Sequence, residues 1–324
     1  MKRFVVVLFF TVLTCVVCLT NFTAQANAYP DRPIDLIVPL PPGSAADAAG
    51  RLLADELGKV LGQTVVVVNK PGASLTVGTG LVARSKKDGY TLAYTATSGI
   101  IYARVTNPEM VHYNPDKDLE PLALHTFFPL AVPVQTSSPW KTFAEFIDYA
   151  KANPKKLRVG THGTASIDHF NLEIIQAETS AQFTHVPFKG GDETTSAVLG
   201  GHVEAISHAF TKIIPHEEAG KLRILLVSRK IPQYPRFPTM ADFGYKQGLL
   251  SAWFALYAPV GIPEDVKNVL VPAIKKAITN PGLTDKLTKM GFMVEYNPPA
   301  ELMKIQKADY KQALAIAKKI GLRK

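Results

Sequence analysis

Apolar residues alternate along this chain between the spacing of strands and the spacing of helices. Residues 34–38 form a short run of strand-forming residues that Pro39 closes. Over residues 47–61 the apolar positions recur at helical spacing, and Gly62 stands where such a helix would end. Residues 64–68 are a continuous β-branched run, typical of a strand covered on both faces. This β-loop-α-β order predicts parallel strands joined by a right-handed crossover.

The same alternation continues to the end of the chain. The pattern predicts further strands over residues 91–94, 157–160, 183–186, 203–207, 222–227 and 252–258. It predicts further helices over residues 142–151, 168–179, 192–199, 263–278, 283–290 and 299–320, with Thr142 as the cap of the first. Strands that alternate with helices predict an α/β fold with mostly parallel sheets.

The first 28 residues have the pattern of a secretory signal peptide rather than of a folded segment. Residues 2–3 are basic, residues 4–13 are almost wholly apolar, and residues 26–28 form a small-x-small cleavage site. A membrane anchor is the alternative, but the apolar stretch is barely long enough for one. Cys15 and Cys18 both lie in this segment. The mature chain would therefore lack thiols, which excludes disulfides, thiolate metal sites and cysteine nucleophiles.

The composition is that of an ordinary globular protein, with 47% hydrophobic and 19% charged residues. It excludes a disordered or low-complexity chain, and 324 residues suffice for about two domains. The net charge of +9 is spread along the chain without long runs of like charge. This distribution argues against a nucleic-acid partner and fits acidic small molecules better.

Motifs for cofactors, metals and catalysis are incomplete. Residues 78–80 could begin a dinucleotide fingerprint, but its third glycine is missing. His162 and His169 lack an obvious third metal ligand. Ser166, Asp168 and His169 are the residue types of a hydrolase triad, but they stand too close in sequence to line up readily. We therefore predict no catalytic residue, no cofactor and no metal site.

Four small, polar loops follow predicted strands, at residues 43–47, 96–99, 160–166 and 188–192. Ligands of open α/β sheets bind at the carboxyl ends of the strands. Helix N-termini there offer free N–H donors and the positive end of the helix dipole, which suit anions. Each loop alone would be no more than a set of N-cap residues. Four such loops in one exported chain predict a binding cleft.

A series of different short motifs follows along the chain from residue 29 onward. They stand at residues 29–34, 41–43, 68–73, 88–92, 185–190, 200–201, 219–223, 238–239 and 258–259, together with Asp47 and Arg51. Together they resemble the substrate-binding proteins of tripartite tricarboxylate transporters, also called Bug receptors. The resemblance implies a type II periplasmic-binding-protein fold, in which two crossing strands join two Rossmann-like lobes and a carboxylated ligand lies between them.

Applied to this sequence, the resemblance implies a first lobe of residues 29–126 plus 251–324 and a second lobe of residues 127–250. It implies a monomeric receptor in the periplasm of a Gram-negative bacterium. The receptor would capture a small mono- or dicarboxylate for membrane transporter subunits. Two alternatives stay open: an exported hydrolase of a small ester or amide with His169 as base, and a receptor that signals to a sensor kinase.

The candidate ligand-binding residues follow from these loops and the resemblance. They are Ser44, Ala45, Ala46, Asp47, Thr97, Ser98, Thr161, His162, Thr164, Ala165, His169, Lys189, Gly190, Gly191, Asp192 and His208. We expect Asp47 mainly to cap its helix. Lys189 is either a countercharge for the ligand or a solvated loop lysine. Trp253, on a crossing strand, is expected to pack at the hinge.

Four positions depart from the family pattern. Ser44 and Ala45 replace a usual glycine pair, and their Cβ atoms restrict the backbone. His162 is large for its loop, and His208 stands where many relatives carry an acid. A histidine beside a bound carboxylate gains a proton, and His208 is the strongest candidate. The alternative for His208 is packing against a neighbouring helix.

Overall fold

The computed structural model describes residues 29–323, so the expected signal peptide lies outside the described residues. Its strands are β1 (Ile34–Val38), β2 (Val65–Asn69), β3 (Thr91–Ala96), β4 (Leu119–Phe128), β5 (Leu130–Gln135), β6 (Arg158–Thr161), β7 (Thr184–Pro187), β8 (Ala205–Ile206), β9 (His208–Ala209), β10 (Leu222–Val227), β11 (Ala252–Pro259) and β12 (Met293–Asn297). Its helices are α2 (Ala45–Leu61), α3 (Thr76–Ala83), α4 (Ala103–Thr106), α5 (Pro115–Asp118), α6 (Phe143–Ala152), α7 (Ile167–Thr179), α8 (Gly191–Leu199), α9 (Phe210–Glu218), α10 (Glu264–Ile278), α11 (Pro281–Lys289) and α12 (Pro299–Lys319).

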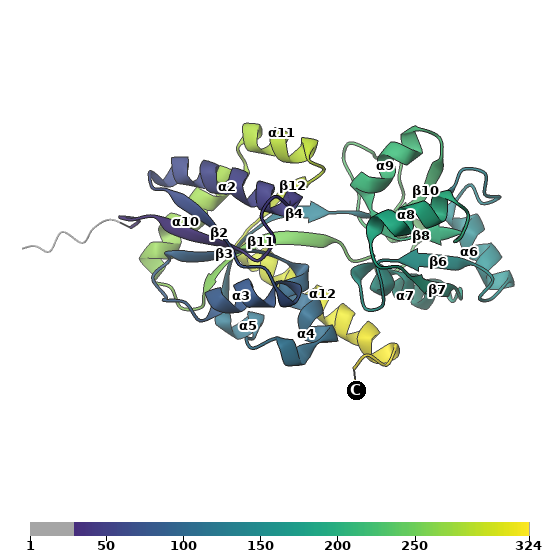
Figure 1. The fold of residues 1–324 in the computed structure, drawn as a ribbon, viewed down its shortest axis with the longest axis horizontal. Coiled ribbons are helices and arrows are strands. Elements are labelled where there is room, and N and C mark those ends of the chain that lie inside the picture. The colour runs from purple at the N-terminus through teal and green to yellow at the C-terminus, as the bar shows by residue number, and fades with distance from the viewer. Residues whose placement is uncertain (1–28, 324) are drawn as a thin grey trace, which may run out of the picture.

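The strands form two sheets, around which the helices pack (Figure 1). The first sheet has the order β12-β4-β11-β3-β1-β2, and the second has the order β10-β5-β8-β6-β7, with β9 paired to β5. We call the part of the molecule built on the first sheet lobe 1 and the part built on the second sheet lobe 2. The described chain is thus an α/β protein with two lobes, as predicted.

Lobe 1 opens with the predicted β-loop-α-β unit. β1 pairs in parallel with both β2 and β3. Ser44 caps α2 because its Oγ accepts the N–H of Asp47 at 3.1 Å, and Gly62 ends the helix in a left-handed conformation with φ 69°. The apolar face of α2 is buried, with Leu53 and Leu57 fully enclosed. The local sequence pattern therefore determined this unit.

Lobe 2 repeats the arrangement with β6, α7 and β7. β6 pairs in parallel with β7 and with β8. Ser166 caps α7 because its Oγ accepts the N–H of His169 at 3.2 Å. Thr142 caps α6 in the same way, as predicted, through the N–H of Glu145 at 3.2 Å. The N-termini of both α2 and α7 therefore follow the carboxyl ends of parallel strands.

Each sheet contains one inner strand that runs against its neighbours. β11 lies between β3 and β4 and is antiparallel to both, and β5 is antiparallel to β8 and β10. Apart from these strands, only the edge strand β12 breaks the common direction of its sheet, because the short β9 is antiparallel to β5 and so runs with the other strands. Most strands of each sheet therefore run in the same direction, as expected. Several neighbouring pairs are nevertheless antiparallel, because the chain must return after passing between the lobes.

Two apolar runs, of which the second was predicted as one strand, are broken in the structure. The apolar run around residues 127–134 is divided into β4 and β5 at Pro129, which has no N–H to donate to a ladder. The run at residues 203–207 shortens to β8, and Ser207 separates it from β9. Ser207 instead directs its hydroxyl to Asp168, as described below.

Helices α3 and α9 and strand β12 were not predicted. Two glycines weaken the helical pattern of α3. A Cβ on Gly78 would lie 2.8 Å from both the carbonyl oxygen of Lys70 and the Cβ of Pro39, so this glycine serves close packing rather than a cofactor. α9 contains Pro215, a residue that disfavours helix interiors. β12 is half-buried throughout and lacks a clear alternation.

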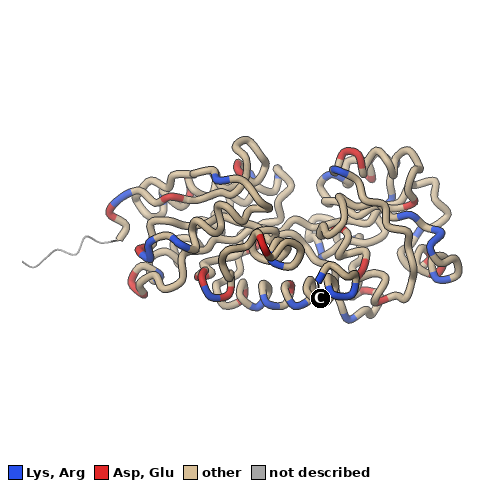
Figure 2. Tube along the Cα trace, turned by 60° about the horizontal axis from the view of Figure 1, so that its bottom comes forward, with Lys and Arg blue, Asp and Glu red and all other residues tan. Residues whose placement is uncertain are grey.

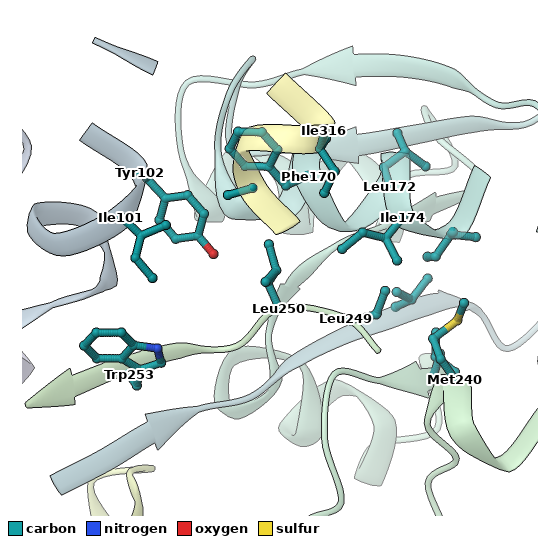
Figure 3. Close-up of a cluster of buried hydrophobic side chains, with 14 of the residues drawn as sticks. Ile101, Tyr102, Phe170, Leu172, Ile174, Met240, Leu249, Leu250, Trp253 and Ile316 are labelled. Atoms are coloured by element: carbon teal, nitrogen blue, oxygen red, sulfur yellow. The ribbon is translucent and has the colours of Figure 1, made fainter. Parts of the chain in front are cut away.

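A cluster of buried apolar side chains joins the two lobes (Figure 3). Tyr102 of lobe 1 stacks on Phe170 of lobe 2, with ring centroids 5.6 Å apart. Trp253 is fully buried in this cluster, and its Nε1 donates to Asp309 at 2.9 Å. Trp253 therefore packs between the lobes, as expected, rather than presenting its ring to a ligand.

Charged residues are dispersed over both lobes. Lys and Arg alternate with Asp and Glu along the chain trace in Figure 2. Within residues 29–323, no helix combines the length and the apolar character needed to cross a membrane.

Candidate ligand-binding site

A cavity of about 370 Å³ lies between the two lobes. From lobe 1 it is lined by Ser74, Thr97, Ser98, Tyr102, Ala103, Thr106 and Asn107. From lobe 2 it is lined by His162, Thr164, Ala165, Ser166, Ile167 and Asp168, and Ala252 at the start of β11 completes the wall. The cavity therefore stands at the carboxyl ends of β3 and β6, where the sequence places a binding cleft.

The lobe 1 wall is built on the segment that follows β3. Residues Ser98–Tyr102 form a π-helical turn, a rare conformation that recurs at functional sites. The turn is held from outside, because the hydroxyl of Tyr113 donates to the carbonyl oxygen of Gly99. Thr97 is only 1% exposed, yet its hydroxyl has no hydrogen-bond partner within residues 29–323.

The lobe 2 wall is the loop between β6 and α7. Ala165 has a φ of 65°, which residues with a side chain seldom adopt, and Gly163 has a φ of 107°. The N–H of Ala165 donates to Nδ1 of His169 at 3.1 Å. His169 does not line the cavity but fixes the conformation of the loop that does.

A buried aspartate binds the histidine of this loop and raises its pKa. Oδ2 of Asp168 lies 3.1 Å from Nδ1 of His162, and Oδ1 accepts the hydroxyl of Ser207 at 2.9 Å. Asp168 is 1% exposed. Burial acts to lower the pKa of His162, but the hydrogen bond and charge of Asp168 outweigh it and raise the pKa above its ordinary value. His162 thus enters the cavity wall bound to Asp168, which favours the protonated form of its ring.

His208 stands behind His162. The two rings meet edge to face with centroids 4.2 Å apart, and Nδ1 of His208 accepts the N–H of Ala209 at 2.6 Å. Burial and then the charge of His162 lower the pKa of His208 to about 4. His208 therefore has a lower pKa than His162, because His162, and not His208, is paired with Asp168. That His208 gains a proton beside a bound carboxylate stays a prediction.

A second pair of histidines lies beneath the loop. His169 and His185 stack with centroids 4.0 Å apart, and Nε2 of His185 lies 2.6 Å from Oγ1 of Thr161. Burial lowers the pKa of His169, and burial and then the charge of His169 lower the pKa of His185 to about 4. Thr161 and His169 thus support the cavity wall from behind.

The first predicted loop, residues 44–47, lies outside the cavity wall. The carboxylate of Asp47 accepts the N–H of Gly43 at 2.9 Å, Nε of Arg51 at 3.0 Å and Nδ2 of Asn69 at 2.7 Å. Burial acts to raise its pKa, but these hydrogen bonds outweigh it and hold the pKa of Asp47 below its ordinary value. Asp47 thus fixes the start of α2. Ala45 is exposed there, and Ala46 is buried.

The loop that begins α8 adjoins the cavity without lining it. Lys189 and Asp192 are exposed, and the main-chain N–H of Lys189 donates to Glu193 at 3.0 Å. Gly190 stands at the N-cap without a side-chain cap. A Cβ on Gly191 would lie 2.5 Å from Nε2 of His208 and 3.3 Å from Nε2 of His162. The start of α8 is therefore packed against the two histidines.

Of the predicted residues, the structure brings Thr97, Ser98, His162, Thr164 and Ala165 together in the cavity wall. Sequence reasoning missed several wall residues, namely Ser74, Tyr102, Ala103, Thr106, Asn107, Ser166, Ile167, Asp168 and Ala252. Among these, Asp168 was considered only as a hydrolase residue, whereas Ser166 also belongs to the polar loop 160–166 that the sequence assigns to the cleft.

The arrangement does not form a hydrolase triad. The hydroxyl of Ser166 accepts the backbone N–H of His169, and Asp168 faces His162 instead of His169. Across residues 29–323 no three His, Cys, Asp or Glu side chains converge as metal ligands would. The wall can supply hydroxyls, main-chain N–H groups and the N-terminus of α7, which are means of binding rather than of bond cleavage.

Comparison with known proteins agrees with this picture. A model of the tripartite tricarboxylate transporter family receptors matches residues 49–322. The chain is 34% identical over 304 residues to the UPF0065 protein in the gbd 5′ region of Cupriavidus necator, which covers 93% of this chain and 91% of the relative. It is 31% identical over 269 residues to protein BugT of Bordetella pertussis, with 82% of each chain covered.

Solved structures resemble it over nearly their whole length. A TctC solute-binding protein from Polaromonas, solved without ligand, has a TM-score of 0.83 and 31% identity, covering 90% of this chain and 99% of its own. A Rhodopseudomonas palustris protein with adipate has a TM-score of 0.70 and 27% identity, covering 90% and 98%. MatC from the same species, with bound malate, has a TM-score of 0.66 and 26% identity, covering 89% and 99%.

Proposed function

This chain belongs to the tripartite tricarboxylate transporter receptor family, and from that premise we propose that it is a periplasmic receptor for a small organic carboxylate. Its two-lobed architecture is the type II periplasmic-binding-protein fold expected from the sequence. The receptor captures a mono- or dicarboxylate between its lobes and delivers it to the membrane subunits of a transporter. The mature protein acts as a monomer, without a cofactor.

The observation that carries this proposal is the cavity between the lobes. Its volume of about 370 Å³ is in the range of small-molecule sites. Both lobes contribute to its wall at the carboxyl ends of strands, and the N-terminus of α7 opens into it. The adipate and malate held by two family structures support a carboxylate as the ligand.

The lobes are proposed to comprise residues 29–126 plus 251–324 and residues 127–250. Their junction contains Pro129, where the ladder is interrupted between β4 and β5. Close by, Ser228 Oγ accepts the N–H of Leu130 at 2.9 Å and lies 2.7 Å from Ser251 Oγ. Ligand that contacts both walls favours the closed arrangement by its differential affinity for it.

Thermal unfolding with a panel of mono- and dicarboxylates tests the function. A ligand at 100 times its Kd raises the free energy of unfolding by about 2.7 kcal/mol, which is a readily measured shift. Small-angle scattering with the same ligand should show a smaller radius of gyration. If no acid of the panel shifts the midpoint, the proposed function is contradicted.

A further inference from the structure

The wall of the cavity between the lobes is rich in hydroxyl groups. Ser74, Thr97 and Ser98 reach it from lobe 1, and Thr164 and Ser166 reach it from lobe 2. The hydroxyls of the first three and of Thr164 make no hydrogen bond to any residue of the described chain. Ser166 accepts a backbone N–H and keeps its own proton to donate.

Thr97 is the most constrained member of this set. It is 1% exposed, and it stands between β3 and the π-helical turn, where the backbone is fixed on both sides. Buried polar groups in native proteins almost always have a hydrogen-bond partner. In this wall the hydroxyl of Tyr102 and Nε2 of His162 are buried without a partner among the described residues, and the hydroxyl of Thr97 makes no hydrogen bond either. Such groups in a cavity wall are available to a ligand.

The same wall has no lysine or arginine. Its basic and acidic side chains are His162 and Asp168, which pair with each other at 3.1 Å. Lys189, the lysine predicted for the cleft, is exposed and does not line the cavity. A ligand with two carboxylates would bring a second negative charge next to Asp168 without a fixed cation to balance it, and desolvating that charge is costly.

We propose that this receptor selects monocarboxylates that carry several hydroxyl groups, in the manner of sugar acids, over dicarboxylates and over plain fatty acids of the same length. The inference rests on the proposed function, because it assumes that a carboxylate binds in this cavity. The hydroxyls of the wall exchange hydrogen bonds with those of the ligand as both donor and acceptor, and the single carboxylate uses the main-chain N–H groups.

Titration calorimetry with acids of matched chain length tests the selectivity. The four-carbon probes are threonate, succinate, malate and butyrate, and the six-carbon probes are gluconate, adipate and hexanoate. We expect the polyhydroxy acid of at least one length to bind at least tenfold more tightly than its dicarboxylate and unsubstituted partners. Equal or tighter binding of succinate, malate or adipate overturns the inference but leaves the proposed function intact, whereas binding of none of the probes overturns both.

A variant pair locates the effect in the wall. Thr97→Val removes the hydroxyl with little change of shape, and Thr126→Val makes the same change at a buried threonine of β4 outside the cavity wall. Thr97→Val should weaken binding of the preferred polyhydroxy acid about threefold to tenfold, and the control should not. Both variants should bind a plain fatty acid of the same chain length with the affinity of the wild-type protein. Loss of affinity for both kinds of acid in Thr97→Val, or for neither, contradicts the inference.

Discussion

The loops that begin α2 and α7 have the same construction, but their buried aspartates bind different partners. In each, a serine hydroxyl accepts the N–H of the residue three positions on, at 3.1 Å for Ser44 and 3.2 Å for Ser166. In each, the first helical turn contains a buried aspartate, Asp47 at 2% exposure and Asp168 at 1%. Their partners differ, because Asp47 binds groups of lobe 1 that stand away from the cavity, whereas Asp168 binds His162 in the cavity wall.

The comparison separates two uses of a buried carboxylate. Asp47 stabilises backbone and leaves only main-chain donors at the start of α2. Asp168 fixes the ring of His162 in the loop before α7 and also binds Ser207. The first loop therefore offers a ligand little chemical variety, and specificity is expected to depend on lobe 2 and on the hydroxyls opposite it.

The largest predicted effect comes from replacing the buried aspartate of lobe 1. Asp47→Asn replaces an anionic acceptor of three hydrogen bonds by an amide, and we expect it to lower the free energy of unfolding by about 3 kcal/mol. Ligand selectivity should be unchanged. Urea unfolding and calorimetry measure the two quantities.

The matching change in lobe 2 should affect stability less and the cavity wall more. Asp168→Asn keeps an oxygen for Ser207 but removes the charge beside His162. We expect a smaller loss of free energy of unfolding than in Asp47→Asn, together with a fall in the pKa of His162. NMR titration of the His162 ring measures that pKa. Equal stability losses in the two variants, with an unmoved pKa, would show that the two aspartates have the same role.

Acidification should destabilise lobe 2 more than lobe 1. The pKa values of His185 and His208 are lowered to about 4, so their stabilising effect is present above the unfolded value of about 6.5 and is lost as the pH falls toward 4. Each should cost about 2 kcal/mol between pH 7 and pH 5. In lobe 1, His125, with its pKa lowered to about 3 by burial, adds one such cost.

Burial sets the sign of this effect at His208, and the charges around it adjust its size. His162 and Lys212 lower its pKa, and Asp168 and Asp192 raise it. His162 itself has a raised pKa and opposes the trend, because its contribution is present at low pH and is lost as the pH rises through that value. His208→Asn should reduce the pH dependence of urea unfolding. If the dependence is the same as in wild type, His208 is not a source of acid sensitivity.

A third prediction uses proline at the start of α2. Ala45 is the first residue of the helix, where an N–H has no helical acceptor and proline fits, and Ser44 before it is extended with ψ 156°. Ala45→Pro should therefore fold normally and remove one N–H. Residues 44–47 lie outside the cavity wall, so a contact with the ligand requires that the proposed closure of the lobes brings this loop to the carboxylate. With that contact, we expect about tenfold weaker binding, or about 1.4 kcal/mol.

The control is Ala45→Gly, which keeps the N–H and removes only the methyl group. Calorimetry with the best ligand of the panel measures both variants. Wild-type affinity in a well-folded Ala45→Pro protein would remove this loop from the binding site and leave the cavity wall as the whole site.

The smallest predicted effects concern the two caps. Ser44→Ala and Ser166→Ala each remove one N-cap hydrogen bond and should each lower the free energy of unfolding by about 1 kcal/mol. Only Ser166→Ala should also weaken ligand binding, because Ser166 lines the cavity and Ser44 does not. Thermal unfolding and calorimetry compare the pair. A similar loss of affinity in both variants would mean that both helix starts contact the ligand directly.

Most elements of the fold could be predicted from the sequence because their causes are local. The apolar spacing of α2, its cap at Ser44 and its left-handed end at Gly62 involve partners at most four residues apart. Predicted ends lie mostly within two residues of those observed. The failures were elements such as α3, whose glycines are required by packing against distant backbone, and the strand break at Pro129.

The site was only partly predictable, since its decisive contacts join distant residues. The alternation of strands and helices by itself predicted a cleft at the strand ends and placed Thr97 and His162 there, whereas residues 44–47 and 188–192 lie outside the cavity wall. It could not show that Asp168 would bind Ser207, 39 residues away, and raise the pKa of His162, or that burial would lower the pKa of His208 to about 4. Such partners and burial depend on which loops the two sheets bring together, so only the tertiary structure decided which histidine pairs with an acid and which hydroxyls are left for a ligand.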